Sequence, residues 1–228
     1  MMKFPFLAVA SLALVGAVAQ AQDSKPLNIA RVPIRADAPV LFAPAGWKIE
    51  KRVDGDLNRD KVFDAVLVLV QNTTAKNAAG DPTPRQRALV VLLHDGKGWR
   101  RVGFNGELLM GTRDGGAFYG VVETPVNLAV ARVGIIIKME GGSREVTSTT
   151  HRLRYDPKQA GVYLIGVDSV TRDRATGDVT SKSSNFLTGV KKTAIFKGSS
   201  NKGVTKTSRV STKLRALESL READRYDE

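Results

Sequence analysis

Short apolar runs rich in β-branched residues, each followed by turn residues, restrict this chain to a β-sheet fold. The turns between runs contain Asp95-Gly96, Gly141-Gly142 and Asp156-Pro157, and Asp-Gly favours a tight hairpin because both residues tolerate positive φ. The pattern predicts an all-β fold, predominantly an antiparallel sheet or sandwich. The strand-length runs occupy residues 65–70, 88–93, 99–104, 133–139, 145–155, 162–171, 179–188 and 190–196, within a β-rich domain over residues 47–200.

The first 21 residues have the organisation of an export signal. Lys3 precedes an apolar run over residues 4–18, and small residues accompany Ala19 and Ala21. The run is short for a membrane span, and polar residues follow it at once. We therefore predict a cleaved signal peptide over residues 1–21, a periplasmic or secreted protein, and no transmembrane anchor in the mature form.

Composition excludes several classes of site and partner. The chain has no cysteine, which excludes disulfides, thiolate metal sites, cysteine nucleophiles and the lipid anchor of lipoproteins. Lysine and arginine total 35 against 23 aspartates and glutamates, and the formal charge of +12 favours anionic partners. Aromatic residues make up 6% of the chain and no recognition motif for nucleic acid is present, so nucleic acid is not an expected partner.

Four prolines precede the β-rich domain. They predict a proline-rich extended segment over residues 22–46, because proline removes a ladder donor and disfavours helix. Within it, residues 40–42 are expected to form a short edge strand.

The C-terminal residues 201–228 are expected to form a basic segment followed by a short C-terminal helix. Ser211 and Thr212 can cap this helix, and Leu214, Leu217 and Leu220 recur at a helical interval. We expect the leucine stripe to pack on the sheet.

A loop rich in oxygen side chains directly precedes the run at residues 65–70. Calcium gathers six or more oxygens, so this loop is a candidate calcium site, although Lys61 stands where such loops usually have glycine. In the alternative interpretation, the same side chains accept hydrogen bonds from their own turn and no metal is needed. The candidate ligands are the side chains of Asp56, Asn58, Asp60 and Asp64 and the main-chain carbonyl of Val62.

The aspartate loop and the run after it resemble the calcium-loop-plus-strand signature of FG-GAP/VCBS-type repeats. The residues that carry the resemblance are Asp56-Leu57-Asn58-Arg59-Asp60, Asp64 and Ala65-Val66-Leu67. Over residues 50–195, the order of this loop and the later runs is similar to a group of small exported bacterial proteins of unassigned function. The resemblance implies a periplasmic location and no enzyme activity. Only one copy of the loop is found, so a propeller of several blades is not expected.

Catalytic residues are scarce. The only histidines are His94 and His151, each expected at a turn or a sheet surface, and no nucleophile elbow, zinc motif or phosphate loop is present. A hydrolase of an envelope polymer would have to use carboxylates of the aspartate loop, or Glu107 and Glu123.

Cations dominate the region after residue 189. The candidate residues for an anionic partner are Lys191, Lys192, Lys197, Lys202, Lys206 and Arg209. They could dock on an anionic envelope polymer, lipid headgroups or an acidic protein. Alternatively, lysines at alternate strand positions could protect a sheet edge from unwanted pairing.

These observations favour a non-enzymatic binding module of the periplasm or the secreted fraction, with calcium as a candidate stabilising cofactor. Its expected partner is an envelope or secreted protein, or an anionic polymer. Two alternatives stay open: an envelope-polymer hydrolase that uses Asp and Glu carboxylates, and a binder of anionic envelope surfaces through the basic C-terminal region.

Overall fold

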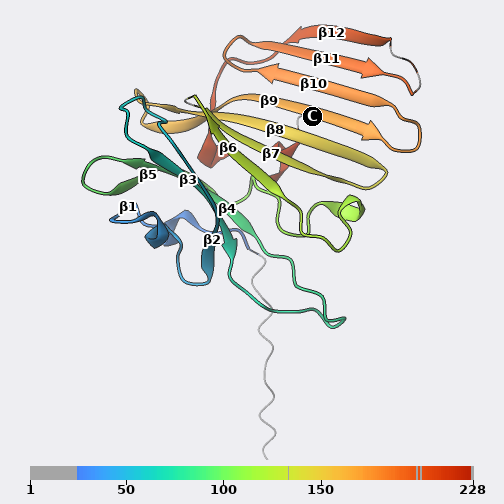
Figure 1. Ribbon diagram of the computed structural model, residues 1–228. Coiled ribbons are helices and arrows are strands. Elements are labelled where there is room, and N and C mark those ends of the chain that lie inside the picture. Colours follow the sequence, from blue (N-terminus) through green and yellow to red (C-terminus); the bar gives the residue numbers. More distant parts are fainter. Residues whose placement is uncertain (1–24, 133, 199, 201, 227–228) are drawn as a thin grey trace, which may run out of the picture.

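Two antiparallel β-sheets form the chain (Figure 1), as a computed structural model shows for residues 25–132, 134–198, 200 and 202–226. The prediction of an all-β fold is confirmed. The predicted signal peptide over residues 1–21 lies outside the described residues. In the smaller sheet the order is β1-β5-β4-β3-β2, from β1 (Arg35–Ala36), β2 (Trp47–Gly55), β3 (Asp64–Gln71), β4 (Arg87–His94) and β5 (Trp99–Asn105).

The larger sheet has the order β12-β11-β10-β9-β8-β7-β6, and the short β13 also pairs with β9. Consecutive strands are neighbours throughout, which is the arrangement that short hairpin turns produce. The strands are β6 (Val126–Ala131), β7 (Gly134–Gly142), β8 (Glu145–Asp156), β9 (Gly161–Asp173), β10 (Val179–Asn185), β11 (Val190–Phe196), β12 (Gly203–Arg209) and β13 (Arg215–Ala216).

Strands β3 and β4 are buried on both faces, which explains their continuous apolar sequences. Alternate residues point to opposite faces of a strand, so Val66 and Val68 enter the core between the two sheets. Ala65 and Leu67 enter a second core beneath the smaller sheet. Two separate apolar clusters therefore stabilise this sheet.

The proline-rich segment covers the second core. Leu27 and Val32, which flank the 3-10 turn η1 (Ile29–Arg31), and Phe42 of the 3-10 turn η2 (Pro39–Phe42) pack in this second core. The expected edge strand at residues 40–42 was wrong, because this stretch forms η2, and the short edge strand is β1. Proline at the start of a turn presets the φ that a 3-10 turn needs.

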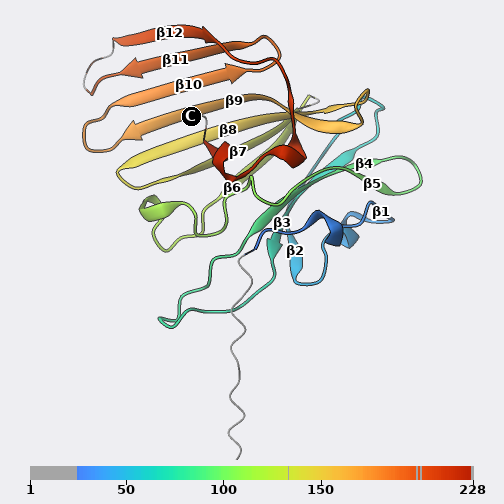
Figure 2. The ribbon, with the colours of Figure 1, turned by 180° about the vertical axis from the view of Figure 1, so that it is seen from behind.

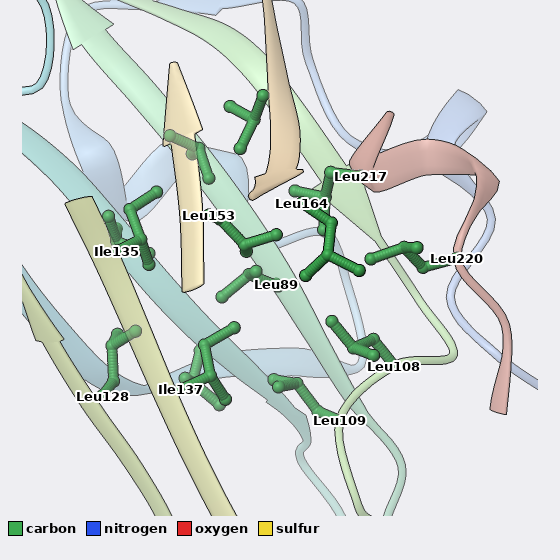
Figure 3. Packing of buried hydrophobic residues seen from close by; sticks show 14 of the residues in the cluster. Leu89, Leu108, Leu109, Leu128, Ile135, Ile137, Leu153, Leu164, Leu217 and Leu220 are labelled. Carbon is green, nitrogen blue, oxygen red and sulfur yellow. The ribbon is translucent and has the colours of Figure 1, made fainter. Parts of the chain in front are cut away.

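The main core lies between the two sheets, as Figure 3 shows in close view. Leu128, Ile137 and Leu153 of the larger sheet pack toward Leu89 of the smaller sheet. Each buried leucine or isoleucine contributes about 1.5–3 kcal/mol relative to an exposed side chain. This apolar layer fixes the face of β6–β9 that turns inward.

The C-terminal residues 211–226, here called the C-terminal strap, run back across the larger sheet (Figure 2). The expected α-helix was wrong: β13 is extended, and only the 3-10 turns η4 (Leu217–Ser219) and η5 (Glu222–Arg225) follow. The Asn105 amide donates to the carbonyls of Leu217 and Leu220 at 2.7 and 2.9 Å. These tertiary bonds and the pairing of β13 with β9 replace the carbonyl partners that a helix would supply. Leu217 and Leu220 nevertheless pack into the main core, as expected.

Within the described ranges, no helix has both the length and the apolar character required to cross a bilayer.

Candidate functional site

The aspartate loop connects β2 to β3 and is closed by its own side chains. Asp56 accepts main-chain N–H bonds from Arg59 at 2.6 Å and from Lys61 at 3.0 Å. Asp60 accepts the Val62 N–H at 2.7 Å, and the Asn58 amide donates to Asp60 at 2.8 Å. The Val62 N–H, with the Asn58 amide second, holds the pKa of Asp60 below its usual range. The side chains thus form a self-capped turn.

Asp64 lies at the base of this loop and is fully buried. Its two oxygens accept the main-chain N–H groups of Leu57 at 2.8 Å and of His94 at 3.1 Å. Burial raises the pKa of Asp64, those two N–H bonds oppose the shift, and the charges of Asp60 and Asp56 add to it. Asp64 therefore ties the loop to the first residues of β3 and to the end of β4.

The oxygen chemistry of Asp56, Asn58 and Asp60 fits a hard cation, and the backbone of the loop is strained. Arg59 and Lys61 have φ of 69° and 70°, a conformation that costs an L-residue about 1–2 kcal/mol. However, Asn58 directs its amide nitrogen to Asp60, and both oxygens of Asp64 are engaged by main-chain donors. Among the described residues, no group of three or more histidine, aspartate or glutamate side chains forms a metal site. Calcium binding at this loop stays a prediction.

The residues considered for catalysis lie in different surroundings. His94 contacts Trp99 edge-on with ring centroids 5.0 Å apart. The expectation that His151 lies at a turn or a sheet surface was wrong, because it is fully buried, with Nε2 2.7 Å from the main-chain oxygen of Asp224. Glu123 pairs with Arg85 through two bonds of 2.7 and 2.9 Å.

Glu107 lies elsewhere, in a hollow between the N-terminal segment and the C-terminal strap. Arg221 and Glu218 line this hollow as well, and Glu123 is not among its lining residues. The carboxylates proposed for a hydrolase are therefore not collected in this hollow.

Strand pairing divides the basic candidates between the two faces of the larger sheet. Ile137 of β7 pairs with His151, and the row continues across β9 and β10 to Lys191 of β11 and Ser208 of β12. Paired residues share a face, so we call the face of this row the core face and the opposite one the outer face. Lys206 lies two residues from Ser208 and so also stands on the core face.

The other strand-borne cations stand on the outer face. Lys192 pairs with Thr207, and Val190 pairs with Arg209, one position out of step with the core-face row. Lys197 follows β11 and is 2.6 Å from Asp178, a hydrogen bond that raises the pKa of Lys197. Lys202 directly precedes the first residue of β12. The six candidates therefore do not form a single flat docking face.

Strand β12 is the outermost strand of the larger sheet, and all seven of its residues are exposed. Figures 1 and 2 show, from opposite sides, that no other labelled element lies over β11 or β12 in the described part of the chain. We call β10–β12 the open end of the larger sheet. Strand β12 was not predicted from the sequence, although Val204 and the threonines on either side of Lys206 favour a strand.

The main chain of β12 faces its neighbour and the solvent alternately. The Val210 N–H donates to the Gly189 carbonyl at 3.0 Å, which fixes the phase of the ladder between β11 and β12. In an antiparallel pair, hydrogen-bonded and non-bonded positions alternate. Lys206 and Ser208 therefore direct their N–H and C=O groups to β11, whereas Thr205, Thr207 and Arg209 direct theirs outward.

No protein-family model, no curated protein and no solved structure matches this chain significantly. The class of protein is thus defined by its geometry: a two-sheet, all-β protein with a self-capped aspartate loop and an open, basic sheet end. The resemblance to FG-GAP/VCBS-type repeats stays a prediction.

Proposed function

We propose that this chain is a non-enzymatic binding module of the periplasm or the secreted fraction, and that its open end holds an acidic envelope or secreted protein. The observation that carries the proposal is a stretch of 39 residues, 179–217, that contains nine cations and no carboxylate. Such a concentration attracts an anionic partner and accelerates its encounter. Seven of the cations lie in or between β10, β11 and β12, namely Lys182, Lys191, Lys192, Lys197, Lys202, Lys206 and Arg209. The other two, Lys213 and Arg215, lie in the C-terminal strap. Asp178 pairs with Lys197 and Asp224 pairs with Arg215, so these two cations do not carry the proposal.

The position of the charge supports a binding role over a merely solvating one. The apolar cores lie between β6–β9 and the smaller sheet and beneath the smaller sheet, and residues of β11 and β12 belong to neither core. The open end thus adds exposed surface without adding to either cluster. We infer that this surface serves an interaction.

The hydrolase alternative receives less support. Glycoside hydrolysis uses two carboxyl groups about 5–9.5 Å apart across the bond that is cleaved. The Glu107 carboxylate lies 3.9 Å from Arg221 and that of Glu123 pairs with Arg85, while Asp64 is buried with both oxygens bonded to main-chain N–H groups. We therefore give the aspartate loop a structural role, with calcium as its proposed stabilising ligand.

Charge reversal at the open end tests the proposal. The binding variant carries Lys192→Glu, Lys206→Glu and Arg209→Glu, and the matched control carries Lys76→Glu, Lys97→Glu and Lys158→Glu at exposed positions elsewhere. Both variants change the net charge equally, and exposed substitutions usually cost little stability. Affinity capture from an envelope extract should retain an acidic protein on the native chain and on the control, and should lose it on the binding variant.

Salt provides a second readout in the same experiment. Exposed charges are screened over about 8 Å at physiological ionic strength, so the retained protein should elute as salt is raised. Equal retention on all three proteins, at every salt concentration, would refute the proposal. Retention of a polysaccharide or lipid instead of a protein would refute the partner class and favour the binder of anionic envelope surfaces.

A further inference from the structure

We infer that β12 is a receiving edge, and that it binds an extended acidic segment of the partner by adding that segment to the larger sheet as a further antiparallel strand. The inference rests on the proposed function for its acidic protein partner. It adds the mode of binding, the strand that receives the partner and the pattern of residues that the partner must carry.

The first support is the outward main chain of β12. Thr205, Thr207 and Arg209 direct their N–H and C=O groups away from β11, and β12 contains no proline. An edge of this kind is a template for another strand unless it is covered, bulged, interrupted by proline or blunted by charged side chains, and of these devices β12 has only its charges in the described part of the chain. Register shifts interrupt the pairing of β2 with β3, of β4 with β5 and of β8 with β9. The pairing of β11 with β12 is continuous over all seven positions.

The second support is the division of cations between the two faces. Lys191 and Lys206 stand on the core face, while Lys192 and Arg209 stand on the outer face. A flat anionic surface laid on one face meets only the cations of that face. A strand added beside β12 lies at the boundary of both faces, and its own side chains alternate between them. At the edge, one added strand can therefore contact Lys206 on the core face and Arg209 on the outer face.

Charge also selects among the occupants of the edge. Pairing with β12 of a second copy would bring Lys206 and Arg209 close to the same cations of the other chain, and like charges across strands are destabilising. The same charges attract a segment that carries carboxylates. The cations thus disfavour self-association and favour an acidic strand, so that protection of the edge and recognition of a partner share the same residues.

The register defines the pattern expected in the partner. Toward the added strand, Lys206 occupies a position that is not hydrogen-bonded. Side chains of residues paired at such positions approach most closely, so a carboxylate should stand opposite Lys206. A second carboxylate should stand opposite Arg209, three positions away in the added strand. Val204 is 75% exposed, and an apolar residue opposite it, two positions beyond the first carboxylate, would cover it.

A synthetic peptide tests this mode directly. The probe is a capped eight-residue peptide with glutamates placed to oppose Arg209 and Lys206, a valine placed to oppose Val204, and threonine or serine elsewhere. Its matched control has the same sequence but carries N-methyl groups on the two residues that oppose Thr207 and Arg209. Removing two inter-strand hydrogen bonds should weaken binding at least about tenfold, while the charge is unchanged.

Two protein variants complete the test. Thr207→Pro removes one outward N–H and leaves the bonds from Lys206 and Ser208 to β11 in place, so it should weaken binding of the probe by about two- to tenfold. Lys206→Glu should weaken binding of the probe by a similar factor, because the new carboxylate repels the glutamate of the peptide that is placed opposite it. The N-methylated peptide needs no variant, so the test holds even where Thr207→Pro disturbs the fold.

The outcomes separate this inference from the proposed function. Equal binding of the plain and N-methylated peptides, with loss on Lys206→Glu, would refute strand addition and leave an acidic partner bound by charge. Equal binding to the native chain and to Lys206→Glu would refute the role of the open end itself. Dimerisation of the native chain that Thr207→Pro abolishes would refute the choice of occupant and assign the edge to a second copy.

Discussion

At the scale of single residues, main-chain donors engage the carboxylates that the sequence singles out. Asp56, Asp60 and Asp64 each accept at least one main-chain N–H bond, and together they shape the turn that precedes β3. A carboxylate that accepts such bonds keeps a lone pair for a cation, because each oxygen has two. The self-capped turn is therefore compatible with a bound cation, and an experiment separates the metal-free loop from the occupied one.

Calcium should raise the melting temperature of the purified protein, since a ligand that binds only the folded state stabilises it. Asp60→Ala should abolish that increment, because Asp60 is exposed within the loop and its oxygens belong to the candidate set. The measurement is thermal unfolding in excess calcium and in chelator. Asp81→Ala, in a different exposed loop, serves as the control and should keep the increment. Identical curves in calcium and chelator for the native chain would establish the metal-free turn.

At the scale of elements, burial decided which strands the sequence could predict. The runs in β3 and β4 are continuous because both faces are buried, and they were predicted within one or two residues of their observed limits. Strand β12 has no buried face, so it carries no apolar alternation, and its cations were interpreted as a separate segment. For the same reason, the division of the cations between two faces could not be predicted. The face on which a side chain lies depends on the register of its strand, and an exposed strand has no apolar pattern that defines the register.

At the C-terminal strap, the sequence pattern predicted an element, a helix, that does not form. Leucines at positions 214, 217 and 220 have helical spacing, but the packing of a strap is set by partners far away in the sequence. Arg225 is 6% exposed and donates to the carbonyls of Leu108 and Leu109 at 3.2 and 2.7 Å. These contacts join segments that are more than 100 residues apart in the sequence, and no local sequence pattern predicts them.

A pair of leucine substitutions distinguishes the strap from a helix. Leu217→Ala should lower the free energy of unfolding by about 2–5 kcal/mol, the usual cost of a cavity at a fully buried leucine. Leu214 is only partly buried, so Leu214→Ala should cost clearly less. Urea unfolding of both variants measures the difference. Equal losses would contradict the strap, because they would place both leucines on one buried helical face.

At the scale of the whole molecule, burial and exposure are segregated along the larger sheet. One end of this sheet, β6–β9, packs on the smaller sheet, which the proline-rich segment covers in turn. The other end extends past these layers as the open end, with β12 at its margin (Figure 1). The layered part provides stability, and the open end provides an edge whose main chain and cations are accessible together. This segregation is the basis of the proposed binding role.

Amide hydrogen exchange in β12 tests that account most directly. In the protein alone, the N–H groups of Lys206 and Ser208 should be protected by β11, whereas those of Thr205 and Thr207 should exchange nearly as fast as in an unfolded chain. With the acidic probe peptide at saturation, Thr205 and Thr207 should become protected while Lys206 and Ser208 change little. Thr207 protected in the protein alone, or unprotected with the peptide bound, would contradict the receiving edge.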